Sequence, residues 1–153
     1  MNMESKPSRK LELKLWQNKT NKEIDPDLFS ARADELARVI YREGKDQEKK
    51  QLNKPTQIRK FYDEVLRFDS LIKTKTNFSE LLPYLKMLNA KAAYALGRNL
   101  ISQGFKEFIS TSLDQIKDKE DFNVFVSLFE AFMGYYKFYY EKEGEQIAQG
   151  GRI

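Results

Sequence analysis

Apolar residues recur at helical spacing along most of the chain. In the segment after Pro55 they return at spacings of three and four residues, which places them on one face of a helix. These positions are Ile58, Phe61, Tyr62, Val65, Phe68 and Ile72. Nowhere does a period-two strand pattern compete with the helical one. The pattern therefore predicts an all-α protein.

N-caps, prolines and glycines set the bounds of about five helices. A capping residue followed by proline is typical of a helix start, and glycine is typical of a helix end. Such residues are Asp25, Pro26, Gly44, Pro55, Asn77 and Gly104. They predict helices over 26–43, from 55 to the segment KTKTN at 73–77, and over 78–102, 105–118 and 120–143. Pro83 lacks a backbone N–H and predicts a bend or a later start in the third helix.

The segments outside these helices are polar. Residues 1–22 carry six Lys and Arg against two Glu, and only Leu11, Leu13, Leu15 and Trp16 can dock on a core, so a flexible basic arm is expected. Residues 44–54 have almost no apolar content and predict an exposed, mobile loop. At 153 residues, we expect one compact bundle domain over 23–144, followed by a frayed tail over 145–153.

The chain contains neither histidine nor cysteine, which removes many kinds of chemistry. Disulfides, thiolate metal sites, Ser-His-Asp and Cys-His systems and H-E-x-x-H zinc sites all need one of the two. We find no glycine-rich phosphate loop and no calcium loop. We therefore expect a non-catalytic protein without metal or cofactor. An enzyme based on carboxylates or lysine is the remaining catalytic alternative, although the adjacent Asp63 and Glu64 point in different directions on a helix.

The N-terminal sequence has basic residues but no apolar signal region, and no apolar run approaches the roughly 18 residues that a membrane span needs. A cytoplasmic protein without membrane association is expected.

The formal charge of +4 is unevenly distributed. Residues 43–60 carry six basic and three acidic side chains, whereas residues 121–143 carry two basic and four acidic ones. A concentration of positive charge in the N-terminal arm, one loop and the middle helices favours an anionic partner. Ordinary lysine-rich solubility explains the same distribution.

The third predicted helix has a polar stripe well away from its leucines. At about 100° per residue, its members fall within a narrow sector. They are Tyr84, Met87, Lys91, Tyr94 and Arg98. Lys supplies a point charge, Arg a fork that matches phosphate oxygens, and Tyr a hydroxyl or a stacking plane. The stripe is either a contact surface for a sugar-phosphate backbone or a solvated helix face.

The second and fifth helices add two further candidate surfaces. Arg59, Lys60 and Arg67 lie on the second helix, where Asp63 and Glu64 provide carboxylates at a spacing of four residues that can neutralise them. The fifth helix holds nine of the 20 aromatic residues between Phe122 and Tyr140. Its side chains Tyr135, Phe138 and Tyr139 extend the apolar coverage beyond one face. Either another subunit or the chain's own first and fourth helices cover this excess.

Three stretches together resemble one family. They are TQIRKFYDEV (56–65), LPYLKMLNAKAAYALGR (82–98) and FNVFVSLFEAFMGYYKFYYEKEG (122–144). The chain resembles the small subunit of type III-A CRISPR interference complexes, the Csm complexes, over residues 56–144. The resemblance implies a small helical bundle without nuclease activity, of which copies stack alongside the guide RNA and its bound target. Target cleavage would belong to neighbouring subunits.

The resemblance also implies which residues contact RNA. The matching basic positions are Arg59, Lys60, Lys86, Lys91 and Arg98, of which Lys91 and Arg98 also share the polar stripe. Lys86 projects from another side of the helix, where it can serve a subunit contact. The implied partners are guide CRISPR RNA, target RNA, other Csm subunits and copies of the chain itself. The alternative is a helical protein–protein adaptor, or a homodimer, that uses the aromatic last helix and binds no nucleic acid.

Overall fold

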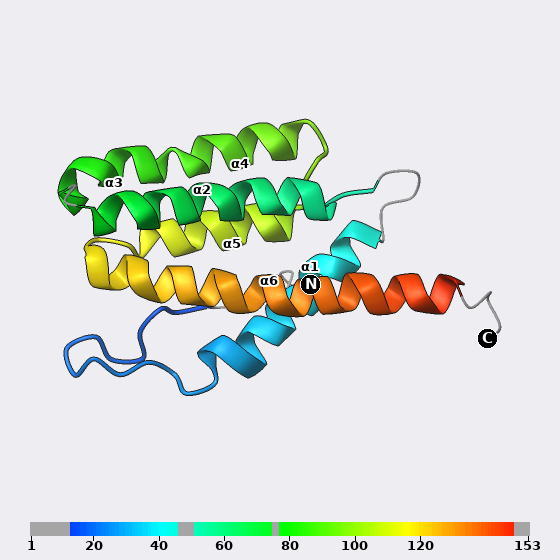
Figure 1. Cartoon of the computed structure of the whole chain (residues 1–153), viewed down its shortest axis with the longest axis horizontal. Coiled ribbons are helices and arrows are strands. Elements are labelled where there is room, and N and C mark those ends of the chain that lie inside the picture. The colour runs from blue at the N-terminus through cyan, green and yellow to red at the C-terminus, as the bar shows by residue number, and fades with distance from the viewer. Residues whose placement is uncertain (1–12, 46–50, 75–76, 149–153) are drawn as a thin grey trace, which may run out of the picture.

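The computed structural model describes residues 13–45, 51–74 and 77–148, of which 143–148 are described by their backbone alone. In these ranges the chain forms six α-helices and one turn of π-helix, and no strand (Figure 1). An isolated β-bridge joins Asn18 and Glu23. The predicted all-α bundle is confirmed.

The core of the bundle is a stack of phenylalanine rings between two helices, α5 (Gln103–Asp114) and α6 (Lys119–Ala148). Phe108 of α5 lies 5.3 Å from Phe129 of α6, measured between ring centroids, and Phe105 lies 6.2 Å from Phe132. Aromatic pairs at these distances stabilise a core beyond the area that they bury. The helical spacing of the aromatic residues in α6 is what aligns its rings on one side.

Helix α2 (Pro55–Lys73) covers another side of this core. The face predicted from its apolar spacing is buried at Ile58, Phe61, Val65, Phe68 and Ile72. Figure 1 shows α2 running alongside α6, and α3 (Phe78–Lys86) with α4 (Leu88–Gly97) forming an outer row above α2 and α5.

The predicted third helix is divided and ends earlier than expected. At Met87 the backbone N–H donates to the carbonyl of Tyr84, which makes a tighter turn, four residues after Pro83, and separates α3 from α4. The helix does not continue to residue 102. It ends at Gly97, because Asn99 adopts a φ of 60°, a conformation that terminates many helices, and the N–H of Leu100 bonds back to Ala95. Helix α5 begins two residues earlier than predicted, where the Ser102 side chain accepts a hydrogen bond from the N–H of Phe105.

Helix α1 (Ala33–Lys45) follows the π-helical turn η1 (Leu28–Arg32) and crosses α6 obliquely (Figure 1). Its buried side chains Leu36, Ala37 and Ile40 face the bundle. Helix α6 extends to Ala148, past the predicted end at 143, so residues 145–148 of the expected frayed tail are helical. Residues 149–153 lie outside the described ranges.

The expected arm is partly folded. Residues 13–23, here called the N-terminal strap, pack against α5 and the start of α6. The amide of Gln115 holds the strap backbone, because it accepts from the N–H of Leu15 and donates to the carbonyl of Leu13, both at 2.8 Å. Leu13 and Leu15 are buried. The prediction of a flexible arm is therefore wrong for residues 13–22, and residues 1–12 lie outside the described ranges.

The loop predicted over 44–54 is not exposed throughout. Asn53 is fully buried, and its side-chain amide donates to the carbonyl of Ile40 at 3.0 Å and to the hydroxyl of Ser102 at 2.9 Å. Its amide oxygen accepts from the N–H of Ser102 at 2.8 Å. Leu52 is buried beside it. The segment thus anchors α1 and the start of α5, while residues 46–50 lie outside the described ranges.

None of the helices in the described part of the chain has the length and the apolar content that crossing a membrane requires.

Candidate nucleic-acid interface

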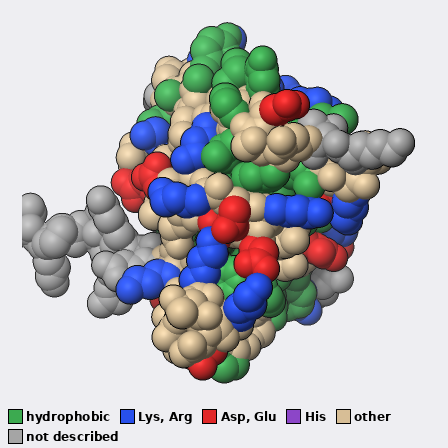
Figure 2. Space-filling view, turned by 90° about the vertical axis from the view of Figure 1, so that its left-hand side faces the viewer, with side chains coloured by type: hydrophobic (Ala, Val, Ile, Leu, Met, Phe, Trp, Pro, Cys, Tyr) green, Lys and Arg blue, Asp and Glu red, His purple; other side chains and the backbone are tan. Residues whose placement is uncertain are grey.

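The outer face of α3 and α4 carries the polar stripe that the helical geometry predicted. Tyr84 is 61% exposed, Tyr94 is 64% exposed, and Met87 between them is also exposed. The opposite face is buried at Leu85, Leu88, Ala92 and Ala95. Figure 2, which looks at the left-hand side of the view in Figure 1, shows hydrophobic side chains gathered at the top of the molecule, over α3. The two short helices thus share one continuous exposed surface across the turn at Met87.

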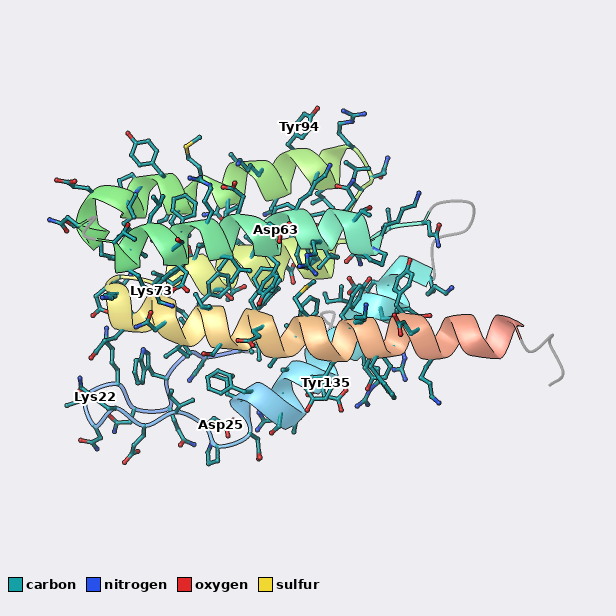
Figure 3. The ribbon with its side chains drawn as sticks, in the orientation of Figure 1. Lys22, Asp25, Asp63, Lys73, Tyr94 and Tyr135 are labelled. Carbon is teal, nitrogen blue, oxygen red and sulfur yellow. The ribbon has the colours of Figure 1, made fainter. Side chains whose placement is uncertain are left out.

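Arg98 lies at the C-terminal end of this stripe and is held by Tyr94. One terminal nitrogen of its guanidinium donates to the Tyr94 hydroxyl at 2.9 Å, and the guanidinium carbon lies 5.6 Å from the centroid of the ring. Figure 3 shows Tyr94 pointing away from the bundle. In the described ranges Arg98 makes no ion pair with a carboxylate. Its charge and most of its N–H groups therefore face solvent in a defined orientation.

Lys91, in the middle of the stripe, has a carboxylate partner. Its Nζ lies 3.6 Å from Oε1 of Glu64 in α2. The same carboxylate contacts the guanidinium of Arg67 at 3.1 and 3.2 Å. Hydrogen bonds from Arg67, opposed by partial burial and supported by the charge of Lys91, lower the pKa of Glu64. Glu64 is therefore an anion at neutral pH, and it neutralises part of the charge that Lys91 presents.

The remaining predicted cations lie around this surface rather than on it. Arg59 of α2 pairs with Asp63 at 3.4 Å, and its guanidinium carbon lies 6.0 Å from the centroid of Tyr62. Lys60 is exposed on α2 and Lys86 is half-buried on α3. Among the residues that the structure describes, neither lysine forms an ion pair. Lys91 is thus joined to α2 by its ion pair with Glu64, whereas Lys86 and Arg98 form no ion pair with a described carboxylate of α2.

Two of the three ion pairs expected along α2 do not form. Lys60 does not pair with Glu64, and Asp63 does not pair with Arg67. Glu64 instead binds Arg67, three residues further along, together with Lys91 of the neighbouring helix. Sequence reasoning missed this arrangement because the spacing along α2 gives no information on which side chain α4 brings alongside.

The aromatic excess of α6 is covered in part by α1. The Tyr139 hydroxyl donates to the carboxylate of Asp34 and accepts from Nε of Arg38 at 3.2 Å. Tyr135 is half-buried on the core, whereas Phe138 is 54% exposed. Helix α1 of the same chain therefore covers Tyr139. Phe138 is the member of the predicted protein interface that stays open.

A groove of about 1290 Å³ lies between the N-terminal strap, α1 and α5. Its lining includes apolar side chains such as Leu36 and Phe108, and the carboxylates of Glu43, Glu107 and Asp121. The lining also includes Lys14, Lys19 and Lys117, so its charges are mixed, and Lys19 already pairs with Asp118 and Asp121. Among the described residues, no group of three or more His, Cys, Asp or Glu side chains is arranged to hold a metal ion.

Asp121 is the most buried carboxylate of the groove, and it has a structural role. It forms a reciprocal capping box with Asp118 at the start of α6, because each backbone N–H donates to the other's carboxylate, at 3.0 and 3.2 Å. It also accepts from the indole N–H of Trp16 at 2.7 Å and pairs with Lys19 at 2.8 Å. Burial acts to raise the pKa of Asp121, but these hydrogen bonds outweigh burial and lower it. A carboxylate held as an anion in this way is a poor proton donor.

The chain matches a known protein family. A family model described as Csm2 Type III-A matches residues 24–142. The matched region spans every helix from η1 through most of α6 and includes the exposed stripe and the Glu64 cluster. Searches among curated proteins and among solved structures returned no match.

Proposed function

The chain belongs to the Csm2 type III-A family, the small subunits of type III-A Csm effector complexes, and on this premise we propose that it supplies the complex with a non-catalytic surface for the RNA backbone. The surface comprises the stripe on α3 and α4 together with the cations of α2 that border it. The cations of this surface are Arg59 and Lys60 on α2, Lys86 on α3, Lys91 on α4 and Arg98 just after α4. The ligand is the duplex of guide CRISPR RNA and target RNA.

The observation that carries this proposal is the exposed stripe with Arg98 at its end. A subunit that must accept any guide sequence gains from contacts with phosphate and with duplex shape, and loses from contacts with base edges. An arginine that has no carboxylate partner in the described ranges, and that is oriented by Tyr94, has the fork geometry that phosphate oxygens require. The stripe supplies charge and hydroxyl groups on one exposed face.

Repetition supports weak contacts of this kind. We propose that copies of the chain lie side by side along the duplex, together with the other Csm subunits. Each copy then needs only modest affinity, because contacts made by linked copies reinforce one another through effective concentration. The exposed Phe138, beside the half-buried Tyr135, is the side chain that we assign to contact with a neighbouring subunit. We do not assign Tyr139 to that role, because its hydroxyl already bonds to Asp34 and Arg38 of α1.

A protein adaptor without nucleic-acid binding is the second candidate. The exposed side chains Tyr84, Met87 and Tyr94 favour it, because large exposed apolar groups that lie close together mark contact surfaces, and the exposed Phe138 on α6 offers a second contact. The two candidates differ in what Lys91 and Arg98 contribute. For an adaptor they are solvated surface cations, whereas for an RNA subunit each neutralises a phosphate.

The test compares two double variants in binding to a short RNA duplex over a range of salt concentrations. Replacing Lys91 and Arg98 with Ala is expected to lower the salt slope of the affinity by about one unit for each phosphate that is no longer neutralised. The matched control replaces Lys73 and Lys137, which are exposed lysines outside the stripe, each paired with a carboxylate four residues away along its own helix. Figure 3 shows Lys73 at the end of α2 that is distant from Tyr94. Equal effects from the two double variants would favour the adaptor.

Assembly is tested by purifying the tagged protein from its host under mild conditions. Short CRISPR RNAs and several other Csm subunits are expected to accompany it. Recovery with protein partners but without RNA would contradict the proposed RNA contact.

A further inference from the structure

Glu64 holds together two cations that come from different helices. Its Oε1 lies 3.1 Å from a terminal nitrogen of Arg67 in α2 and 3.6 Å from Nζ of Lys91 in α4. Its Oε2 accepts from Nε of Arg67 at 3.2 Å. Because both cations contact one oxygen atom, they lie close enough for the two non-bridging oxygens of a single phosphate to reach both.

Both cations keep donors that a ligand can use. Arg67 has five N–H groups and gives only two of them to Glu64. The distance from Lys91 to Glu64 exceeds that of an ordinary hydrogen bond, so the ammonium is attracted by the carboxylate without being fixed to it. The Arg67 and Lys91 side chains are both more than half exposed.

The ring of Phe68 also orients the Arg67 side chain. Its guanidinium carbon lies 4.7 Å from the centroid of the Phe68 ring, a side chain that belongs to the buried face of α2. A cation over an aromatic face and a carboxylate fork on one edge fix the plane of the guanidinium. Its remaining N–H groups are therefore arranged before any ligand arrives.

We propose that Arg67 and Lys91 form a binding site for one backbone phosphate of RNA, with Glu64 as the counter-ion that holds the two cations together in the free protein. The site rests on the proposed function and adds Arg67 and Glu64 to its residues. Phosphate binding draws Lys91 from Glu64, while the Arg67–Glu64 fork stays in place. Glu64 also limits the affinity, because its negative charge lies beside that of the phosphate.

The experiment measures the affinity of the full chain for a short RNA duplex of arbitrary sequence, at low salt and over a salt series, for three variants. Arg67→Gln keeps the aliphatic stem over Phe68 but removes the charge, and is expected to lower the salt slope by about one unit. Glu64→Gln keeps the shape and an acceptor oxygen, and is expected to raise the affinity up to about fivefold, as one unit charge at about 4 Å does in water. Lys73→Ala, a cation on the same helix outside the site, is the control and is expected to change neither quantity.

The combination of Arg67→Gln with Lys91→Ala tests whether the two cations share one phosphate. If they do, Lys91→Ala lowers the salt slope clearly less in the chain that already carries Arg67→Gln than in the unmodified chain. Full additivity would contradict a shared phosphate.

If Lys91→Ala and Arg98→Ala weaken binding to the RNA duplex while Arg67→Gln and Glu64→Gln leave it unchanged, the proposed phosphate site is wrong and the proposed function stands. If none of these four substitutions changes the affinity for RNA or its salt slope, the phosphate site and the proposed function are both wrong. Circular dichroism of each variant confirms that its helices are retained.

Discussion

The hydroxyl of Tyr136 in α6 donates a hydrogen bond to the backbone carbonyl of Asn53, 83 residues earlier in the chain. Asn53 has a φ of 59°, and its backbone N–H donates to the carbonyl of Leu100 at 2.9 Å. With its side-chain bonds to Ile40 and Ser102, this one buried residue joins α1, the α4–α5 connection and α6. Asparagine suits the position because it tolerates the left-handed conformation and supplies both donors and an acceptor.

Replacing Tyr136 with Phe removes the hydroxyl and leaves the carbonyl of Asn53 without that donor in a buried place. We expect the free energy of unfolding to fall by about 1–3 kcal/mol, the cost of a buried polar group that loses its partner. Urea unfolding measures this change. Tyr135→Phe is the matched control on the same helix, since Tyr135 makes no hydroxyl hydrogen bond with the described residues, and it is expected to change stability by less than about 0.5 kcal/mol.

The role of Asn53 could not be predicted from the sequence, whereas the buried face of α6 could. Phe125, Phe129 and Phe132 recur at spacings of four and three residues, which places them on one face of a helix, and all three are buried. Asn53 lies in a polar stretch that carries no local signal, and its partners come from three distant segments. Composition alone predicted an exposed loop there.

Two glycines on different helices provide a contrast in packing. A Cβ added to Gly44 would lie 2.5 Å from the backbone carbonyl oxygen of Leu52, which cannot move without disturbing Asn53. We therefore expect Gly44→Ala to lower the free energy of unfolding by about 1–3 kcal/mol, the usual cost of overpacking. Gly134, inside α6, has nothing within 4 Å of such a Cβ. Gly134→Ala is expected to raise stability by about 0.5–1 kcal/mol, because alanine is the better helix former. A rise in stability for Gly44→Ala would contradict the described packing of Leu52 against α1, and a fall for Gly134→Ala would contradict the open space around Gly134.

The N-terminal strap is expected to make stability sensitive to acid. The pKa of Asp121 is lowered in the folded chain, so over the acidic range the unfolded chain binds more protons at this residue than the folded one does. The contribution of Asp121 is fully present above its unfolded pKa of about 3.9 and is lost as the pH falls through the lower, folded value. At pH 7, Asp121→Asn is expected to lower the free energy of unfolding by about 1.5–3 kcal/mol, as for other hydrogen bonds to a charged group.

This difference between the two proteins is expected to shrink as the pH falls from 7 to 3, which urea unfolding across that range measures. Asp114→Asn, at an exposed carboxylate near the end of α5, serves as the control and is expected to have little effect at either pH. A difference that stays constant with pH would show that Asp121 acts through shape rather than charge.

The strap and the candidate site show different limits of prediction. Leu13 and Leu15 alternate with polar residues, which is a signal for an extended segment with one buried side, but their partner Gln115 lies about 100 residues away. In the candidate site, the exposed sector with Lys91 and Arg98 followed from 100° per residue. The cluster around Glu64 did not, because it depends on how α2 and α4 lie against each other.

Ultraviolet cross-linking of the RNA-loaded complex can show whether the stripe on α3 and α4 faces RNA. Mass spectrometry identifies which peptides of this subunit carry nucleotides, and the exposed rings of Tyr84 and Tyr94 are suitable reporters. The expected result is cross-linked nucleotide on peptides that contain residues 84–98. Cross-links confined to α1 or α6, or a loaded complex without any cross-link to this subunit, would contradict the proposed RNA contact.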